Sequence, residues 1–208
     1  VALTATAGAC LAGIGAGYAL SRRGLPGREL LDSLCTLPLV LPPTVIGYYL
    51  LVVFGRKGIV GKWLEESFDV SLVFTWQGAA LAASVVAFPL VCKAARTAFE
   101  GVDEGLENAA RTLGAGEGRV FLRVTLPLAW RGIVAGTMLA LARAMGEFGA
   151  TLMIAGNLPG RTQTLSLAVY EAVQAGREDE AAFLVVLTSC VCIALLLSSG
   201  KLLNRKIS

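Results

Sequence analysis

Histidine is absent from this sequence, and charged residues make up only 16% of its 208 positions. Without histidine the chain has no His-dependent catalytic triad and no zinc finger. Its five cysteines include no C-x-x-C redox pair, and we expect no metal site. Cys190 and Cys192 lie inside an apolar run, where buried thiols are the simpler interpretation. Because 55% of the residues are hydrophobic, disorder is excluded and a soluble enzyme is disfavoured.

Long apolar runs are what the sequence has instead. A helix needs about 20 apolar residues to cross a bilayer. Four runs of that length carry no charge, and a fifth carries only Arg143 and Glu147. The five predicted spans are residues 1–20, 33–55, 70–92, 132–157 and 181–200. The sequence therefore predicts an all-α membrane protein, with residues 1–208 as one domain and a bundle of five transmembrane helices.

The first run could also be read as a signal peptide. It lacks the basic segment that precedes the apolar part of a signal peptide, and Arg22 and Arg23 follow it instead. We therefore expect a retained span. The acidic run 178–180 is interpreted as a solvated loop before the last span, since consecutive positions of a helix point in different directions.

The basic residues outside the spans divide unevenly between the two sides of this bundle. One side carries Arg22, Arg23, Arg28, Lys93, Arg96, Arg111, Arg119, Arg123, Arg131, Lys201, Arg205 and Lys206. The other side carries only Arg56, Lys57, Lys62, Arg161 and Arg177. The positive-inside rule places the first side in the cytoplasm, with the N-terminus outside and the C-terminus inside. Because the basic residues sit at span ends and form no stripe interleaved with aromatics, we expect no nucleic-acid partner.

Two features inside the spans are candidates for a transport pathway or gate. Pro42, Pro43 and Thr44 interrupt the second run, where proline removes a backbone donor and bends the helix. A structural kink and a pore-lining bend are both compatible with this pattern. Arg143 and Glu147 are four residues apart in the fourth span, and hence on one helix face. They either line the translocation path or form an internal ion pair that orients the helix.

Residues 93–131 form the one large loop on the predicted cytoplasmic side. Asp103 and Glu104 favour a helix start. An apolar face follows, with the spacing of a helix, and Gly114 is a typical stop. Its members are Leu106, Ala109, Ala110 and Leu113. A second short helix carries Val120, Phe121 and Val124 and is expected to end at Leu126-Pro127. The pair either docks into a groove on another protein or lies on the membrane beneath its own bundle.

The loop has a recognisable pattern. Residues 108–114 read Asn-Ala-Ala-Arg-Thr-Leu-Gly, and nine residues later 124–127 read Val-Thr-Leu-Pro. This resembles the EAA loop of ABC-importer permeases, in which Glu-Ala-Ala, three residues and Gly are followed after nine residues by Ile-x-Leu-Pro. The family's glutamate position holds Asn108, with Glu107 just before it. The ion pair that this glutamate makes in the family is then either absent or made by Glu107 from a rotated position.

The resemblance implies a function for the loop: its first helix fits a cleft in a cytoplasmic ATPase and couples the two subunits. It also implies a type I importer fold similar to that of the methionine permease. The residues carried over to this role are Glu107, Asn108, Ala109, Ala110, Leu113, Gly114, Leu126 and Pro127.

Further motifs resemble the permeases of molybdate importers. They are Leu-Pro-Leu-Val-Leu-Pro-Pro-Thr-Val-Ile-Gly-Tyr at 37–48, Gly-Arg-Lys-Gly-Ile-Val-Gly at 55–61, Gly-Glu-Phe-Gly-Ala-Thr at 146–151 and Asn-Leu-Pro-Gly-Arg-Thr-Gln-Thr-Leu at 157–165. Sulfate and thiosulfate permeases share the Gly-Glu-Phe/Tyr-Gly stretch, so the Leu-Pro-Pro-Thr and Pro-Gly-Arg-Thr-Gln-Thr contexts favour molybdate. These motifs do not separate tungstate from molybdate.

The implied protein is a non-enzymatic permease subunit of an ATP-driven importer in the cell membrane. Its implied partners are a second copy of itself, two cytoplasmic ATPases, an external molybdate-binding protein and membrane lipid. The sequence has neither a P-loop nor a dinucleotide fingerprint, so ATP and magnesium would be used by the ATPase and not bound here. The alternatives are a sulfate permease and an ion-coupled secondary carrier, which would typically show internal repeats.

Overall fold

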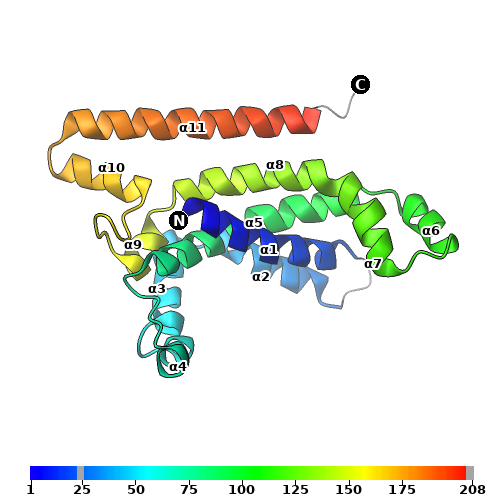
Figure 1. Ribbon diagram of the computed structural model, residues 1–208, viewed down its shortest axis with the longest axis horizontal. Coiled ribbons are helices and arrows are strands. Elements are labelled where there is room, and N and C mark those ends of the chain that lie inside the picture. The colour runs from blue at the N-terminus through cyan, green and yellow to red at the C-terminus, as the bar shows by residue number, and fades with distance from the viewer. Residues whose placement is uncertain (23–25, 205–208) are drawn as a thin grey trace.

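The computed structural model describes residues 1–22 and 26–204, and these residues form helices joined by short loops, without a strand (Figure 1). The helices are α1 (Ala2–Ser21), α2 (Arg28–Val40), α3 (Pro43–Phe54), α4 (Ile59–Phe68), α5 (Trp76–Glu100), α6 (Glu104–Thr112), α7 (Glu117–Val120), the π-helical turn η1 (Phe121–Thr125), α8 (Leu126–Met145), α9 (Gly149–Ala155), α10 (Leu165–Gln174) and α11 (Glu178–Asn204). Arg23, Arg205 and Lys206, which the sequence assigns to the cytoplasmic side, lie outside the described residues.

The described residues contain four helices that are long and apolar enough to cross a membrane, or five if the bent pair α2 and α3 forms one span. The predicted bundle is thereby confirmed, but some boundaries move. The third span begins at Trp76 and continues to Glu100, so the first residues assigned to the loop at 93–131 belong to α5. The acidic run 178–180 forms the first turn of α11, so the loop predicted there is wrong. Carboxylates in a first turn are favourable because they face the positive end of the helix dipole.

The second predicted span is two helices, with an angle of 110° between α2 and α3. Leu41 and Pro42 between them have extended backbone, as residues that precede a proline usually do. Pro43 then starts α3, where its missing N–H costs no hydrogen bond. The prolines therefore break the span completely, where the sequence predicted an interrupted single helix.

The fourth predicted span, 132–157, also divides. Its helix α8 begins at Leu126 and ends at Met145, and the short helix α9 follows after a break at 146–148. The predicted helix end at Leu126-Pro127 is wrong, because η1 passes directly into α8 and Pro127 lies in the first turn of α8. Unlike Pro43, Pro127 follows helical residues, and the π-helical turn before it, in which the N–H of Leu126 bonds to the carbonyl of Phe121, accommodates a residue without an N–H.

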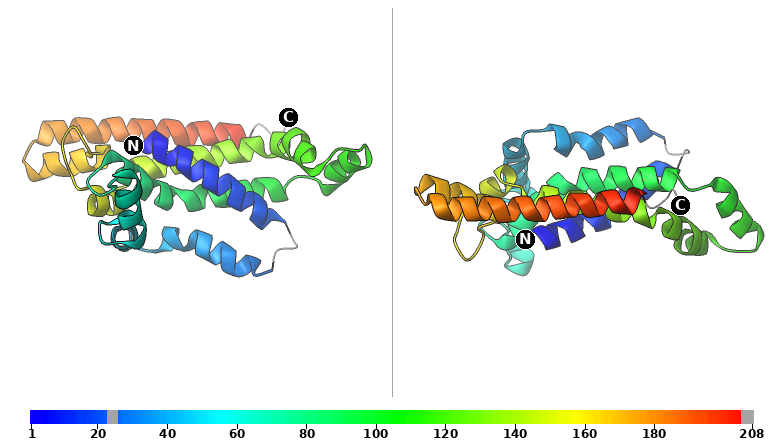
Figure 2. Two further views of the ribbon diagram at one scale, coloured as in Figure 1. Left: turned by 60° about the horizontal axis from the view of Figure 1, so that its bottom comes forward. Right: turned by 90° about the horizontal axis from the view of Figure 1, so that it is seen from above.

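Helix α5 is the centre of the bundle, with α1 packed along one side of it and α8 along another (Figure 2). Small residues allow this close packing, as membrane helices require. A Cβ atom added to Gly13 would lie 2.9 Å from Cβ of Val91, and one added to Gly17 would lie 2.7 Å from the carbonyl oxygen of Cys92. By contrast α2 lies at the periphery and has no buried residue, and few residues of α11 are buried.

The two ends of the bundle differ. Helices α1, α5 and α11 all run toward the end that carries α6 and α7, here called the loop end (Figure 1). The opposite end carries α4, α9 and α10. Helix α3 crosses α9 near that opposite end, where Gly47 lets the helices touch: a Cβ atom there would lie 2.6 Å from Cβ of Met153 and 3.0 Å from Cα of Ala150.

Replacing Gly47 by valine should therefore destabilise the protein by about 3 kcal/mol, because overpacking forces two tightly packed helices apart. Denaturant unfolding of the purified protein in detergent micelles would measure the change. Gly15→Val is the matched control, since a Cβ atom at Gly15 meets nothing within 4 Å. Equal stability of the two variants would contradict the importance of the α3–α9 contact.

Candidate functional site

The loop helix α6 forms where the sequence predicts it. The Asp103 side chain caps its N-terminus, with Oδ1 accepting a hydrogen bond of 2.7 Å from the backbone N–H of Gly105. Glu104 and Glu107 lie in the first turn, where negative charge is favourable. The helix stops before Gly114, whose φ of +83° is easily adopted only by a residue without a side chain.

The apolar face of α6 points away from the rest of the chain. Leu113 is 88% exposed and Leu106 is 50% exposed, Ala109 is exposed, and Ala110 is partly exposed. The exposed apolar residues therefore do not stabilise the isolated chain. Such a face is typical of a helix that docks into a partner.

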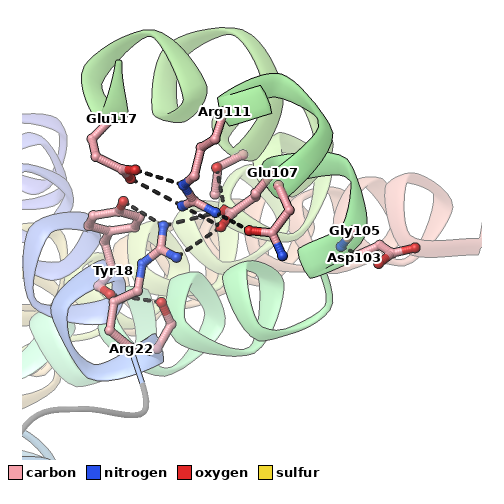
Figure 3. A network of polar contacts seen from close by, with 10 residues as sticks. Tyr18, Arg22, Asp103, Gly105, Glu107, Arg111 and Glu117 are labelled. Carbon is pink, nitrogen blue, oxygen red and sulfur yellow. Dashed lines mark hydrogen bonds and ion pairs between the residues drawn. The ribbon is translucent and has the colours of Figure 1, made fainter. Parts of the chain in front are cut away.

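The buried side of α6 is polar and centres on Glu107, which is only 4% exposed (Figure 3). Arg22, at the end of α1, donates from Nη1 to Oε2 at 2.9 Å and from Nη2 to Oε1 at 3.3 Å. Thr125 of η1 donates from Oγ1 to Oε1 at 2.6 Å, and Arg111 of α6 donates from Nη2 to Oε2 at 3.3 Å. One carboxylate therefore ties together α1, α6 and the start of α8.

Asn108 is exposed, and its Oδ1 accepts a hydrogen bond of 2.8 Å from Nη1 of Arg111. The sequence left open whether the ion pair is absent or is made by Glu107, and in the structure Glu107 forms a buried ion pair with Arg22. Arg111 extends the network to Glu117 at 2.6 Å. Gly114 ends α6, whereas Leu126 and Pro127 begin α8, so the two halves of the motif lie on different elements.

Aromatic rings support the network from the bundle side. The Tyr18 ring packs edge-on against Phe99 and Phe121, at centroid distances of 5.3 and 4.6 Å. Its hydroxyl oxygen accepts a hydrogen bond of 2.6 Å from Nη2 of Arg22. The sequence identified Arg22 only as a charge at a span end and did not identify Tyr18 or Thr125 as part of the site. A basic residue after a span with a tyrosine one turn earlier is a weak signal that could have suggested the pair.

Burial raises the pKa of the Glu107 carboxyl, but the hydrogen bonds from Arg22 and Thr125 lower it more, and the net pKa lies below its ordinary value of 4.5. A carboxyl group whose pKa is lower in the folded state stabilises the fold at pH values above its unfolded pKa. That contribution is lost as the pH falls through the folded pKa.

Replacing Glu107 by glutamine should therefore lower the free energy of unfolding by about 2 kcal/mol at neutral pH, because the ion pair with Arg22 is lost. The difference between the two proteins should shrink as the pH falls below about 4.5. Denaturant unfolding at a series of pH values measures it, with Glu65→Gln on the exposed surface of α4 as the control. A difference that does not change with pH would contradict an ionised Glu107 as the origin of the stability.

At the opposite end, the two breaks in the spans lie against each other. A Cβ atom at Gly149, the first residue of α9, would lie 3.0 Å from Cβ of Pro43 and 3.3 Å from the backbone nitrogen of Thr44. The Pro42 carbonyl accepts hydrogen bonds from the backbone nitrogens of residues 45 and 46, which starts α3. The structure thus brings the proline break next to the break between α8 and α9. Interrupted helices at membrane depth are typical of substrate paths in transporters.

Arg143 and Glu147 form an ion pair, with 2.8 Å between Nη1 and Oε2, which is one of the two alternatives that the sequence left open. Arg143 lies in the last turn of α8, whereas Glu147 lies beyond the helix, in the break, so the prediction that the two share a face of one helix is wrong. Its side chain is 1% exposed, and Oε1 accepts a hydrogen bond of 2.9 Å from the backbone N–H of Ala150. Glu147 therefore also caps the first turn of α9.

The segment 157–164 forms a loop that is held by hydrogen bonds within the loop and to α10. The Thr162 Oγ1 accepts a hydrogen bond of 3.0 Å from the backbone N–H of Leu158. Glu171 on α10 accepts hydrogen bonds from Asn157 at 2.8 Å and from Gln163 at 2.6 Å. Asn157, Thr162 and Gln163 of the sequence motif therefore have structural roles in holding this loop. Across residues 1–22 and 26–204, no three Cys, Asp or Glu side chains are grouped so that they could hold a metal ion.

Comparisons with known proteins agree with this geometry. Residues 9–208 match the family described as Binding-protein-dependent transport system inner membrane component. The chain is 50% identical over 188 residues to the molybdenum transport system permease protein ModB of Escherichia coli strain K12, which covers 90% of this chain and 82% of ModB. It is 40% identical over 162 residues to the sulfate transport system permease protein CysW of Synechococcus elongatus, covering 78% of this chain and 56% of CysW.

The fold also matches a solved structure. A chain of the MetNI methionine ABC transporter, solved in inward-facing conformations, superimposes with a TM-score of 0.75. The match covers 98% of this chain and 90% of that chain, at 17% sequence identity. At this identity the match supports the fold alone, which is the type I importer fold that the sequence predicts.

Proposed function

This chain belongs to the family of binding-protein-dependent transport system inner membrane components, and from that premise we propose that it is the membrane-spanning subunit of an ATP-driven molybdate importer. The observation that carries the proposal is its 50% identity to a molybdenum permease over 90% of the chain. The 40% identity to a sulfate permease over a shorter stretch makes sulfate the second candidate. Tungstate, an oxyanion of similar chemistry, is a further cargo to test.

The coupling role of α6 is supported by its two faces. The apolar face is exposed and free to dock into a cleft of an ATPase, while the polar face is anchored to the bundle through Glu107. A force applied to α6 would pass directly to the end of α1 and the start of α8. The chain itself is not an enzyme in this proposal, because a separate ATPase subunit binds ATP and magnesium.

The orientation follows from the loop end. More of the described basic residues belong to elements at this end than to elements at the opposite end, and by the positive-inside rule this supports a cytoplasmic loop end, with the N-terminus outside and the C-terminus inside. The opposite end, with α4 and α10, then faces an external binding protein that delivers the anion. The exposed apolar surface of α11 and α2 is suited to lipid and to a second copy of the chain.

We propose that the translocation pathway passes the point where the break between α2 and α3 meets the break between α8 and α9, and that the pair Arg143 and Glu147 does not by itself define the pathway. Pro43 and Thr44, which directly follow Pro42, lie against the break between α8 and α9, so movement of α3 would change the shape of this point. Arg143 is neutralised by Glu147, which cancels much of the potential that would attract an anion. The ion pair thus holds the break in position and is not needed to select the cargo.

ATP hydrolysis in proteoliposomes tests the proposal. The vesicles would contain this chain, its ATPase and a molybdate-binding protein, and hydrolysis would be measured with molybdate, tungstate or sulfate. We expect stimulation by molybdate and not by sulfate. Stimulation by sulfate alone would move the chain to the second candidate function, and failure to bind any ATPase would favour an ion-coupled carrier.

A further inference from the structure

A groove of about 680 Å³ opens at the loop end between the last turns of α5, the first half of α8 and Leu202 of α11. It is separate from the network around Glu107 and from the two breaks. Most of its surface is apolar, and its floor is made of small residues that let α5 and α8 touch. A Cβ atom at Gly132 would lie 2.8 Å from Cβ of Ala98. The groove is therefore walled by helices and open to the surroundings of the bundle.

The rim of this groove is basic. Lys93 lies on the α5 side and Arg131 on the α8 side, and none of the described residues that line the groove is acidic. Lys93 is about half exposed, with Nζ 3.4 Å from Oδ2 of Asp32. The Arg131 guanidinium lies 5.9 Å from the ring of Trp130, which is itself 46% exposed. A half-exposed tryptophan beside basic residues is typical of the level of lipid head groups.

From this arrangement we infer that the groove binds an anionic phospholipid of the cytoplasmic leaflet. An acyl chain lies along the apolar floor, and the phosphate is held between Lys93 and Arg131. Charge complementarity favours this occupant, because basic pockets between membrane helices on the cytoplasmic side attract anionic head groups. The choice of leaflet rests on the orientation given under the proposed function, whereas the preference for anionic lipid does not.

Native mass spectrometry of the delipidated full chain tests the inference, without ATPase, binding protein or molybdate. Phosphatidylglycerol and phosphatidylcholine with the same acyl chains would be titrated in turn. We expect the wild type to prefer phosphatidylglycerol by about tenfold, since a basic side chain near the phosphate contributes roughly fivefold and Asp32 offsets part of the contribution of Lys93. The double variant Lys93→Gln/Arg131→Gln should reduce that preference to about twofold.

Two further variants make the result specific. Thr97→Phe places a ring in the groove and keeps both charges, so it should weaken the binding of phosphatidylglycerol. Arg56→Gln/Lys57→Gln removes the same charge from exposed positions at the opposite end and should leave the preference unchanged.

Equal binding of the two lipids by the wild type would overturn the inference, as would an unchanged preference in Lys93→Gln/Arg131→Gln. It would also be overturned if cross-linking from position 97 in membranes captured a second copy of the chain in place of lipid. Because no transport is measured, these outcomes do not depend on whether the cargo is molybdate.

Discussion

Replacing Leu113 by aspartate is expected to abolish molybdate-stimulated ATP hydrolysis while leaving the fold intact. Leu113 is 88% exposed at the end of α6, so the substitution removes no contact within the chain. The free energy of unfolding of the variant should differ from that of the wild type by less than about 0.5 kcal/mol, as for most surface substitutions. In the cleft of the ATPase, however, an aspartate would be buried without a partner, which weakens binding at least about tenfold.

Co-purification with the ATPase and hydrolysis in proteoliposomes would measure this effect. Ile59→Asp is the matched control, because Ile59 is 90% exposed on α4 at the opposite end and meets no ATPase in the proposed orientation. Normal ATPase binding by Leu113→Asp would contradict docking through the apolar face of α6. Loss of binding in both variants would point to general misfolding.

If an ATPase docks at the exposed face of α6 as proposed, the contacts of Glu107 on the opposite face connect that helix to two membrane spans. Arg22 ends α1, and α1 packs along α5 through small residues such as Gly13 and Gly17. Thr125 is the last residue of η1, which continues directly into α8. A tilt of α6 would therefore act on the end of α1 through Arg22 and on the turn before α8 through Thr125.

Local signals in the sequence predicted α6 well. Asp103 as the cap and Gly114 as the stop act within one helical turn of their own positions. The partner of Glu107 could not be predicted in this way, because Arg22 is 85 residues distant and the contact depends on how α1 packs. The sequence left open whether the ion pair is absent or is made by Glu107. The structure shows an ion pair between Glu107 and Arg22.

The breaks in the spans were likewise only partly predictable from local sequence. Pro42 and Pro43 mark where the second span breaks, but the angle of 110° depends on the packing of α3 against α9 through Gly47. Pro127 looks like a helix end in the sequence and is the first turn of α8 in the structure. A proline is compatible with a helix start or a helix end, and only the preceding residues 121–125, which continue as a π-turn, distinguish them.

Arg143→Gln should damage the protein more than Glu147→Gln, and the double variant should recover much of the loss. Removing Arg143 leaves a carboxylate that is 1% exposed, and among the described residues Oε2 of Glu147 has no partner besides Arg143. An uncompensated buried charge destabilises by about 3 to 5 kcal/mol. Glu147→Gln keeps an oxygen that can accept from Ala150 and leaves an arginine that is one-third exposed, so its cost should be about 1 to 2 kcal/mol.

Unfolding and molybdate uptake of the two single variants and the double variant form a double-mutant cycle. The exposed pair Arg177 and Glu180, 2.7 Å apart, supplies the control cycle, in which all variants should lie within about 1 kcal/mol of the wild type. If the ion pair only holds the break between α8 and α9 in place, uptake by the double variant should return to within about threefold of the wild type. If Arg143 instead attracts the anion in the pathway, the double variant would regain stability without regaining uptake, because the positive charge is still missing.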